Sequence, residues 1–213
     1  MEQQVNTTVA FASLAKSALS VPSVFDLYQW VVGAPQCHRR FLDAFAKPCP
    51  GERIIDLGCG TGASLAHLPE GISYVGVDIH SDYIRAALAR FGTRGTFLCS
   101  DLTTVDLSEF APFDLAISSG VLHHLNDAQA RAVVQLARAV VRPGGRLVTI
   151  DPCYVRGQSP IAKFLKDHDR GRHIRDAEGY RQLFAPQDSV ETVVLSGMLR
   201  VPYTMIVATL RFD

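Results

Sequence analysis

The sequence predicts an α/β fold with a doubly wound, mostly parallel sheet that ends in an antiparallel hairpin. Residues 53–57 form a short apolar run closed by three alternate glycines, which is typical of a buried parallel strand turning tightly toward a helix. Further short apolar runs alternate with helix-compatible stretches as far as residue 151. The last two runs, 190–195 and 203–212, are joined by a connection too short for a parallel crossover, so they should pair as a hairpin.

The expected elements follow in order along the chain. An alanine-rich stretch at 13–20 and two further segments, 23–32 and 35–45, are compatible with helices that precede the first strand. After that strand we expect strands at 72–79, 95–99, 113–118 and 146–150. The helices between them are expected at 63–68, at 83–91 and from Asn126 or Asp127 to about residue 141. Residues 161–184 are expected to be helix and charged loop.

Composition limits the function classes. Lys plus Arg equals Asp plus Glu at 21 each, so no global positive field favours nucleic acid as a partner. The five cysteines are odd in number and scattered, without metal-ligand spacing or a disulfide framework, which indicates a reduced cytoplasmic protein without a bound metal. No apolar run approaches membrane-spanning length, and no basic start precedes a continuous apolar segment.

The turn after the first predicted strand is a candidate ligand cradle. Gly58, Gly60 and Gly62 let the backbone approach a bound molecule closely, in front of the amides of a helix N-terminus. Cys59 lies between two of these glycines, and we interpret it as a small residue lining the cradle rather than a nucleophile. The cradle suits an adenosine-type cofactor.

Asp56 decides which cofactor fits. The glycine spacing and Asp78, twenty residues after Gly58, formally satisfy the dinucleotide fingerprint. However, the Asp56 carboxylate would lie beside the pyrophosphate of a dinucleotide, and two anions repel each other there. A cofactor with a cationic sulfonium and an ammonium group removes the conflict, and S-adenosyl-L-methionine has both. A nicotinamide-dependent oxidoreductase is therefore the alternative, and Asp56 and the terminal hairpin argue against it.

Five segments together resemble the motifs of class I S-adenosylmethionine-dependent methyltransferases. They are Ile55–Gly62, Tyr74–Ile79, Phe97–Leu102, Phe113–Ser119 and Val141–Leu147. The resemblance spans about residues 52–151 and implies a Rossmann-like sheet of seven strands, one of them reversed. It implies an enzyme of the EC 2.1.1 class that transfers a methyl group to an oxygen or nitrogen of a small molecule. A non-catalytic relative that only binds is a further alternative.

The resemblance also implies roles for residues at the strand ends. The expected cofactor-binding residues are Asp56, Gly58, Cys59, Gly60, Asp78, Ile79, Asp101, Leu102, Ser118 and Ser119. Asp78 is expected to accept hydrogen bonds from both ribose hydroxyls. Asp101 is expected to accept the adenine amino group, or else to cap a turn, and Leu102 to pack on the ring.

His123, His124 and Asp151 are the candidate catalytic residues, because the family places residues that flank the transferred methyl group here. One histidine is expected to act as a general base, with Asp151 orienting it. The alternative is that the doublet packs or hydrogen-bonds the loop. Only one histidine should face the acceptor, and the sequence leaves open which.

The acceptor side is expected to involve the two ends of the chain. His124, Tyr28 and Trp30 are candidate substrate-binding residues, the last two as lid residues or else as helix packing. We expect one domain over 1–213, with a helical cap (1–50), a cofactor-binding core (52–151), and a substrate-side insertion followed by the hairpin (152–213). The insertion holds seven basic and four acidic residues between 156 and 181, which either attract an acidic group or are solvated.

Overall fold

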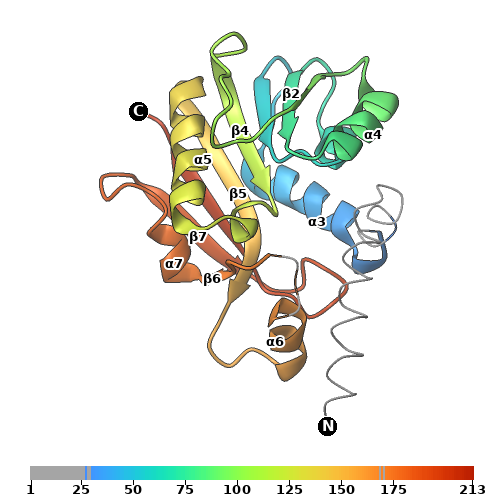
Figure 1. The fold of residues 1–213 in the computed structure, drawn as a ribbon. Helices are drawn as coiled ribbons and strands as arrows, with labels where there is room; N and C mark the ends of the chain where they lie inside the picture. Colours follow the sequence, from blue (N-terminus) through green and yellow to red (C-terminus); the bar gives the residue numbers. More distant parts are fainter. Residues whose placement is uncertain (1–26, 28–29, 168, 170) are drawn as a thin grey trace.

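The computed structural model describes residues 27, 30–167, 169 and 171–213, and the sheet is its centre. The strands are β1 (Arg53–Leu57), β2 (Ser73–Asp78), β3 (Thr96–Cys99), β4 (Phe113–Ser119), β5 (Val141–Tyr154), β6 (Arg175–Asp176), β7 (Val190–Leu195) and β8 (Met205–Arg211). Their order is β3-β2-β1-β4-β5-β8-β7, with β6 paired to β5 (Figure 1). Only the β5–β8 and β7–β8 pairings are antiparallel. The predicted fold class, including the terminal hairpin, is confirmed.

Helices flank the sheet and connect its parallel strands. They are α3 (Ala34–Phe41), the π-helix η1 (Leu42–Ala46), the 3-10 helices η2 (Ala63–His67) and η3 (Leu122–His124), α4 (Ser81–Phe91), α5 (Asp127–Val140), α6 (Pro160–Asp167) and α7 (Ala177–Arg181). The helix expected at 35–45 is therefore an α-helix that continues as a π-helix. The stretch at 13–20, and residues 23–26, 28 and 29 of the segment 23–32, lie outside the described residues.

The start and the buried face of α5 follow directly from its sequence. Asn126 accepts a hydrogen bond from the Gln129 amide, and the Gln129 side chain accepts one from the Asn126 amide, which forms a capping box. Val133, Val134 and Ala137 then recur at helical spacing and are buried against the sheet. The helix thus begins at the residue that the sequence predicts.

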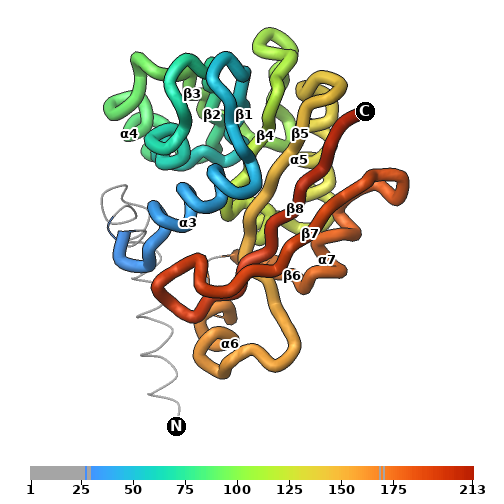
Figure 2. Tube along the Cα trace, turned by 180° about the vertical axis from the view of Figure 1, so that it is seen from behind, coloured from blue at the N-terminus to red at the C-terminus, as the bar shows by residue number. Residues whose placement is uncertain are grey.

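Two apolar clusters lie on opposite faces of the sheet, as a doubly wound fold requires. One cluster gathers residues of α5 and α7 with every second residue of the central strands. The other gathers residues of α3 and α4 with the intervening strand residues and the β7–β8 connection. Seen from behind, α3 and α4 lie on the side of the sheet opposite to α5 (Figure 2). The division of the chain into cap, core and insertion stays a prediction.

β5 is longer than the sequence predicts. It begins at Val141 rather than residue 146, and its pairing with β4 shifts register between Phe113 and Leu115. At its other end it continues past Asp151 to Tyr154, where it pairs with β6 and approaches α6. This extension brings the substrate-side insertion to the carboxyl ends of β4 and β5, the edge at which ligands bind in doubly wound folds.

Candidate functional site

The glycine turn after β1 is an open cradle at the carboxyl edge of the sheet. Gly58, Gly60 and Gly62 all have positive φ, a backbone conformation that residues other than glycine rarely adopt. A Cβ on Gly58 would lie 2.3 Å from Val121 Cγ2, so the turn after β1 closely approaches the turn after β4. A Cβ on Gly60 would meet nothing within 4 Å. The backbone at Gly60 is therefore accessible to a ligand, whereas Gly58 is required by packing.

Asp78 joins the cradle to the end of β2. Its Oδ2 accepts a hydrogen bond from the Gly60 amide at 2.9 Å. Its Oδ1 accepts one from the His80 amide at 2.8 Å and lies 3.0 Å from His80 Nδ1. The next residue, Ile79, is 57% exposed, unusual for a large apolar residue that directly follows a buried strand. A carboxylate and an apolar surface thus lie together at this strand end.

Asp56 lies deeper than its neighbours. Its carboxylate is 1% exposed and accepts hydrogen bonds from the hydroxyls of Tyr74, at 2.9 Å, and Ser64. Burial raises the pKa of Asp56 to about 6, although these hydrogen bonds act in the opposite direction. Any interaction of Asp56 with a ligand in the cradle is therefore through the field of a buried charge rather than through open contact.

The remaining predicted cofactor residues differ in accessibility. Cys59 and Ser118 are buried, while Ser119, Asp101 and Leu102 are half-buried. Asp101 Oδ1 accepts hydrogen bonds from the Thr103 amide and hydroxyl, and these lower the pKa of Asp101. The turn-capping role that the sequence allowed is thus present, and one carboxylate oxygen is taken by it. Contact of these residues with a cofactor stays a prediction.

His123 is held between two carboxylates. Its Nδ1 lies 2.8 Å from Asp151 Oδ1, and its Nε2 lies 3.4 Å from Asp169 Oδ1. The His123 amide also donates to Asp151 Oδ1 at 3.1 Å. Burial alone would lower the pKa of His123, but the two carboxylates raise it to about 9. The sequence predicted that Asp151 orients one histidine of the doublet and left open which, and the structure pairs Asp151 with His123. The raised pKa keeps the His123 imidazole protonated at neutral pH.

The insertion covers His123 but leaves His124 exposed. A Cβ on Gly171 would lie 1.9 Å from His123 Cδ2, so only glycine fits against this ring. The His173 amide donates to the His123 carbonyl at 2.9 Å. His124 is exposed, and its ring centroid lies 4.1 Å from that of His123. Of the two histidines, His124 is the one that reaches the surface.

Arg175 fixes both ends of the histidine turn. Its guanidinium donates to the carbonyls of Leu122, at 3.0 Å, and Leu125, at 2.8 Å. The same group donates to Asp127 Oδ1 at 2.7 Å. In the sequence analysis Arg175 was considered only as one member of a basic segment. These contacts hold η3 in place at the end of β4.

Comparisons with known proteins relate this chain to methyltransferases. Residues 54–145 match the family described as a methyltransferase domain. An uncharacterized methyltransferase of Mycobacterium tuberculosis is 35% identical over 111 residues, covering 51% of this chain and 54% of the relative. An O-methyltransferase of Pyrenophora dematioidea is 32% identical over 112 residues, covering 49% and 41%. The chain thus spans about half the length of the first of these relatives.

A similar fold is also found among solved structures. The N-methyltransferase NodS of Bradyrhizobium japonicum, solved with S-adenosyl-L-homocysteine, has a TM-score of 0.64 at 18% identity. The likeness covers 83% of this chain and 85% of that one. At this identity the likeness shows a shared fold, and it extends over more of the chain than the segment 54–145 that matches the family.

The structure describes one of the two candidate lid residues, Trp30. Tyr28 falls outside the described residues. Trp30 is 59% exposed, its ring lies under the Arg200 guanidinium at 5.4 Å, and its carbonyl accepts from Arg200 at 3.2 Å. The structure thus brings Trp30 to the β7–β8 connection, and its role toward a substrate stays a prediction.

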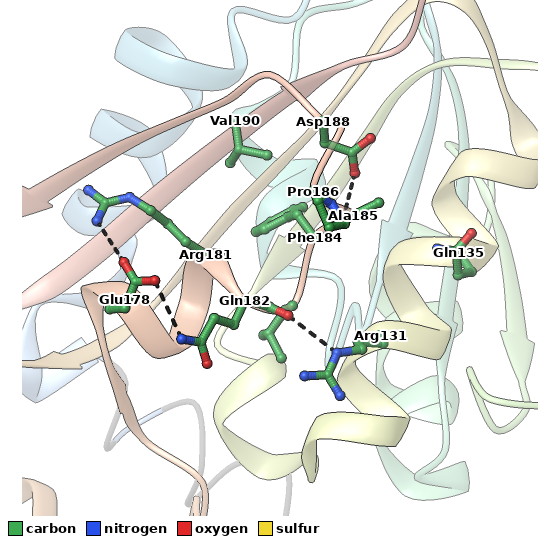
Figure 3. A pocket seen from close by; sticks show the side chains of 11 residues that line it. Arg131, Gln135, Glu178, Arg181, Gln182, Phe184, Ala185, Pro186, Asp188 and Val190 are labelled. Carbon is green, nitrogen blue, oxygen red and sulfur yellow. Dashed lines mark hydrogen bonds and ion pairs between the residues drawn. The ribbon is translucent and has the colours of Figure 1, made fainter.

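A cavity of about 540 Å³ lies between α5, α7 and the segment before β7, and it contains none of the predicted site residues (Figure 3). Its charged side chains bond to one another or to the backbone, as Arg181 does with Glu178 at 3.5 Å and Arg131 with the Gln182 carbonyl at 3.3 Å. We therefore place the candidate site at the cradle rather than in this cavity.

Many charged side chains of the insertion form ion pairs within the protein or are buried. Lys163 pairs with Asp167, Arg175 pairs with Asp127, and Lys166 is buried. Asp169, which contacts His123, and the buried Lys166 were interpreted from the sequence only as members of a charged run. In the sequence, the local signal for a close approach in this run is the glycine at 171, which lies between two arginines and packs against His123 in the structure.

Among the helices that the structure describes, none has the length and apolar character needed to span a membrane.

Proposed function

We propose that this chain is an S-adenosyl-L-methionine-dependent methyltransferase that acts on an oxygen or nitrogen of a small molecule. The observation that carries the proposal is the cradle, where the open backbone at Gly60 lies beside the Asp78 carboxylate. The relatives support the reaction class, since they are named as methyltransferases. Because they include an O-methyltransferase and the structural likeness is to an N-methyltransferase, the acceptor atom stays open.

The residues at the cradle fit this cofactor. Asp78 is positioned for the ribose hydroxyls, the exposed side chain of Ile79 offers an apolar surface for the adenine ring, and the buried charge of Asp56 favours a cation in the cradle. We assign Leu102 and the free oxygen of Asp101 to the adenine side, and Ser119 to the inner side of the crevice. S-adenosyl-L-methionine supplies an electrophilic methyl group on a sulfonium.

The protein's contribution to the reaction is alignment. Holding the acceptor atom in line with the methyl carbon and the sulfur, at roughly 3 Å, supplies several kcal/mol through proximity alone. The turns at Gly58 and Val121 pack closely together, and in this proposal the acceptor and the methyl group meet beside them. The acceptor enters from the side of η3 and the insertion.

His124 rather than His123 is the general base in this proposal. Both ring nitrogens of His123 face carboxylates, and its raised pKa keeps it protonated at neutral pH, so it has no lone pair for an acceptor proton. His124 is exposed on the same turn. Asp151 then acts on the turn through His123, since it bonds the His123 ring and amide.

Ligand binding and turnover test the proposal separately. Thermal shifts with S-adenosyl-L-methionine, S-adenosyl-L-homocysteine and NAD should show stabilisation by the first two, because a ligand that binds only the native state raises its apparent stability. Selective stabilisation by NAD would contradict the assignment and favour an oxidoreductase. Formation of S-adenosyl-L-homocysteine during incubation with pooled small-molecule acceptors distinguishes an enzyme from a non-catalytic binding protein.

We place this activity in the cytoplasm. All five cysteines are free thiols, and three of them are buried. Free thiols persist where the redox environment is reducing. Alkylation of thiols in intact cells before lysis would test this placement, because Cys49 and Cys99 are exposed. Oxidation of these two thiols in cells would contradict it.

A further inference from the structure

Lys166 is a buried ammonium that the proposed methyl transfer does not use. It lies on α6 and is 1% exposed. Its Nζ donates to the Cys153 carbonyl on β5 and to Gln158 Oε1 at 3.0 Å. In the described part of the chain Lys166 forms no ion pair with a carboxylate. Burial lowers the pKa of Lys166, which is the expected direction for an ammonium removed from water.

Two tyrosine rings surround this ammonium. Nζ lies 5.6 Å from the Tyr154 ring centroid and 5.7 Å from the Tyr203 ring centroid. A cation near an aromatic ring is attracted by the negative face of the ring, and the attraction is larger where water is excluded. Tyr203 belongs to the β7–β8 connection, so Lys166 links the insertion to the hairpin as well as to β5.

Tyr203 connects Lys166 to the histidine turn. The Tyr203 hydroxyl donates to Asp169 Oδ2, while Asp169 Oδ1 faces His123 Nε2 at 3.4 Å. Asp169 Oδ1 also accepts from the Gly171 amide at 2.8 Å. One carboxylate therefore bonds the hairpin, the insertion and η3, and its orientation decides whether residues 171–173 stay on His123.

The ammonium of Lys166 offsets negative charge at the carboxylates around His123. Asp151 and Asp169 carry two negative charges, and protonated His123 supplies only one positive charge. Asp151 Oδ2 is buried without a partner among the described residues, so the excess negative charge is poorly compensated by hydrogen bonds. Among the described residues, Lys166 balances the remaining negative charge of these groups, and Tyr203, whose ring lies 5.7 Å from its ammonium, bonds Asp169.

We propose that Lys166 and Tyr203 are positioning residues, which hold Asp169 against His123 and thereby fix residues 171–173 and the histidine turn at the edge of the crevice. The effect on catalysis rests on the function proposed above, but the effect on the structure does not. The assignment differs from a general packing role for α6, because it requires the consequence of losing the ammonium to appear at Gly171 and His173 rather than on α6 alone.

Two substitutions test the two parts of the connection. Lys166→Met keeps the length of the side chain and removes its charge, and Tyr203→Phe keeps the ring and removes the hydroxyl that bonds Asp169. In both variants, amide hydrogen exchange at Gly171 and His173 should accelerate at least tenfold, since these amides bond to Asp169 and His123. Exchange at Ala130, whose amide bonds Asn126 in the capped turn of α5, should stay unchanged. Lys166→Arg should restore protection in part because it keeps a cation near the rings.

The matched control is Lys163→Met on the same helix. It also removes one positive charge from α6, but Lys163 is exposed and, among the described residues, forms an ion pair with Asp167 alone. Exchange at Gly171 and His173 should not change in this control. Lys166→Met leaves the Cys153 carbonyl on β5 without its donor, so this variant can fail to fold. In that case exchange in Tyr203→Phe tests the inference by itself, because that variant keeps the bond from Lys166 to Cys153.

Turnover separates this inference from the proposed function. With an acceptor in hand, Lys166→Met and Tyr203→Phe should lower kcat at least tenfold while the Kd for S-adenosyl-L-methionine stays within twofold of wild type. Unchanged exchange at Gly171 and His173 in both variants would overturn the inference, whatever the activity. Faster exchange in a protein that never turns over would support the connection and would instead contradict the proposed function.

Discussion

His123 Nδ1 lies 2.8 Å from Asp151 Oδ1, and this contact joins the turn after β4 to the end of β5. The two strands are paired in parallel up to Ser119 and Ile150, so their last residues emerge at the same edge of the sheet. On the other side of the ring, His123 Nε2 contacts Asp169, which belongs to the insertion. His123 is therefore the residue through which the sheet and the insertion are connected at the proposed site.

The stability of the protein should fall as pH rises through the titration of His123. Its pKa is about 9 in the folded state against 6.5 ordinarily, so the folded state binds this proton more tightly. The stabilisation is complete below about pH 6.5 and is lost on passing pH 9, with a change of about 3 kcal/mol in the free energy of unfolding. Urea unfolding at a series of pH values measures it. His123→Gln should remove this part of the pH dependence, and an identical slope in the variant would contradict the assignment.

The two histidines should differ in their effect on turnover. His124→Ala should lower kcat about a hundredfold and abolish the acid limb of the rate profile, because the loss of a general base has that magnitude. His123→Gln should retain an acid limb, since it changes the position of the turn rather than the proton acceptor. Rates with saturating cofactor, measured across pH, test both expectations. Near-native turnover and an unchanged profile in His124→Ala would leave alignment as the whole of catalysis.

Loss of the Asp78 carboxylate should weaken cofactor binding. Charge-assisted hydrogen bonds are worth about 1.5–3 kcal/mol, so Asp78→Ala should raise the Kd for S-adenosyl-L-methionine at least tenfold in calorimetry. Asp78→Asn is the matched control, because its amide oxygen can still accept from Gly60 or His80 and so preserves part of the cradle. A folded Asp78→Ala variant with unchanged affinity would show that Asp78 is not the ribose ligand.

The elements that the sequence predicted well are those with a local signal. The apolar run before Gly58, the capping residue Asn126 and the short hairpin connection each specify their own structure within a few residues. The ends of β5 were missed because they depend on partners, namely the shifted pairing with β4 and the contact with β6. No local pattern in the sequence reports either.

The candidate site was predictable in its position but not in its connections. The sequence predicted that one histidine of the doublet lies near Asp151, because both segments follow neighbouring strands, and in the structure that histidine is His123. Asp169 and Lys166 were interpreted as part of a charged run, because the order of charges does not show which of them face inward. Their burial arises from packing of α6 on β5 and from the hairpin residue Tyr203, far along the chain. Arg175 and Gly171 were missed for the same reason.

Asp56 should show opposite effects on stability and on cofactor binding. Its folded-state pKa is about 6 against 3.8 ordinarily, so the folded state favours the protonated form of this buried carboxyl group. The free energy of unfolding should therefore decrease as pH rises from about 4 to 6, and the ionised carboxylate costs about 3 kcal/mol at neutral pH. Asp56→Asn removes the charge and still accepts from the Tyr74 hydroxyl.

At neutral pH the Asp56→Asn protein without cofactor should be more stable than wild type by up to about 3 kcal/mol in urea unfolding, and the difference should vanish near pH 4. Its Kd for S-adenosyl-L-methionine should nevertheless rise at least tenfold, because the buried charge that favours a cation in the cradle is gone. Tyr74→Phe serves as the control, since it removes the hydrogen bond and keeps the carboxylate. If Asp56→Asn gains stability but binds the cofactor as tightly as wild type, Asp56 is not the electrostatic partner of the sulfonium, and the preference for this cofactor arises elsewhere in the cradle.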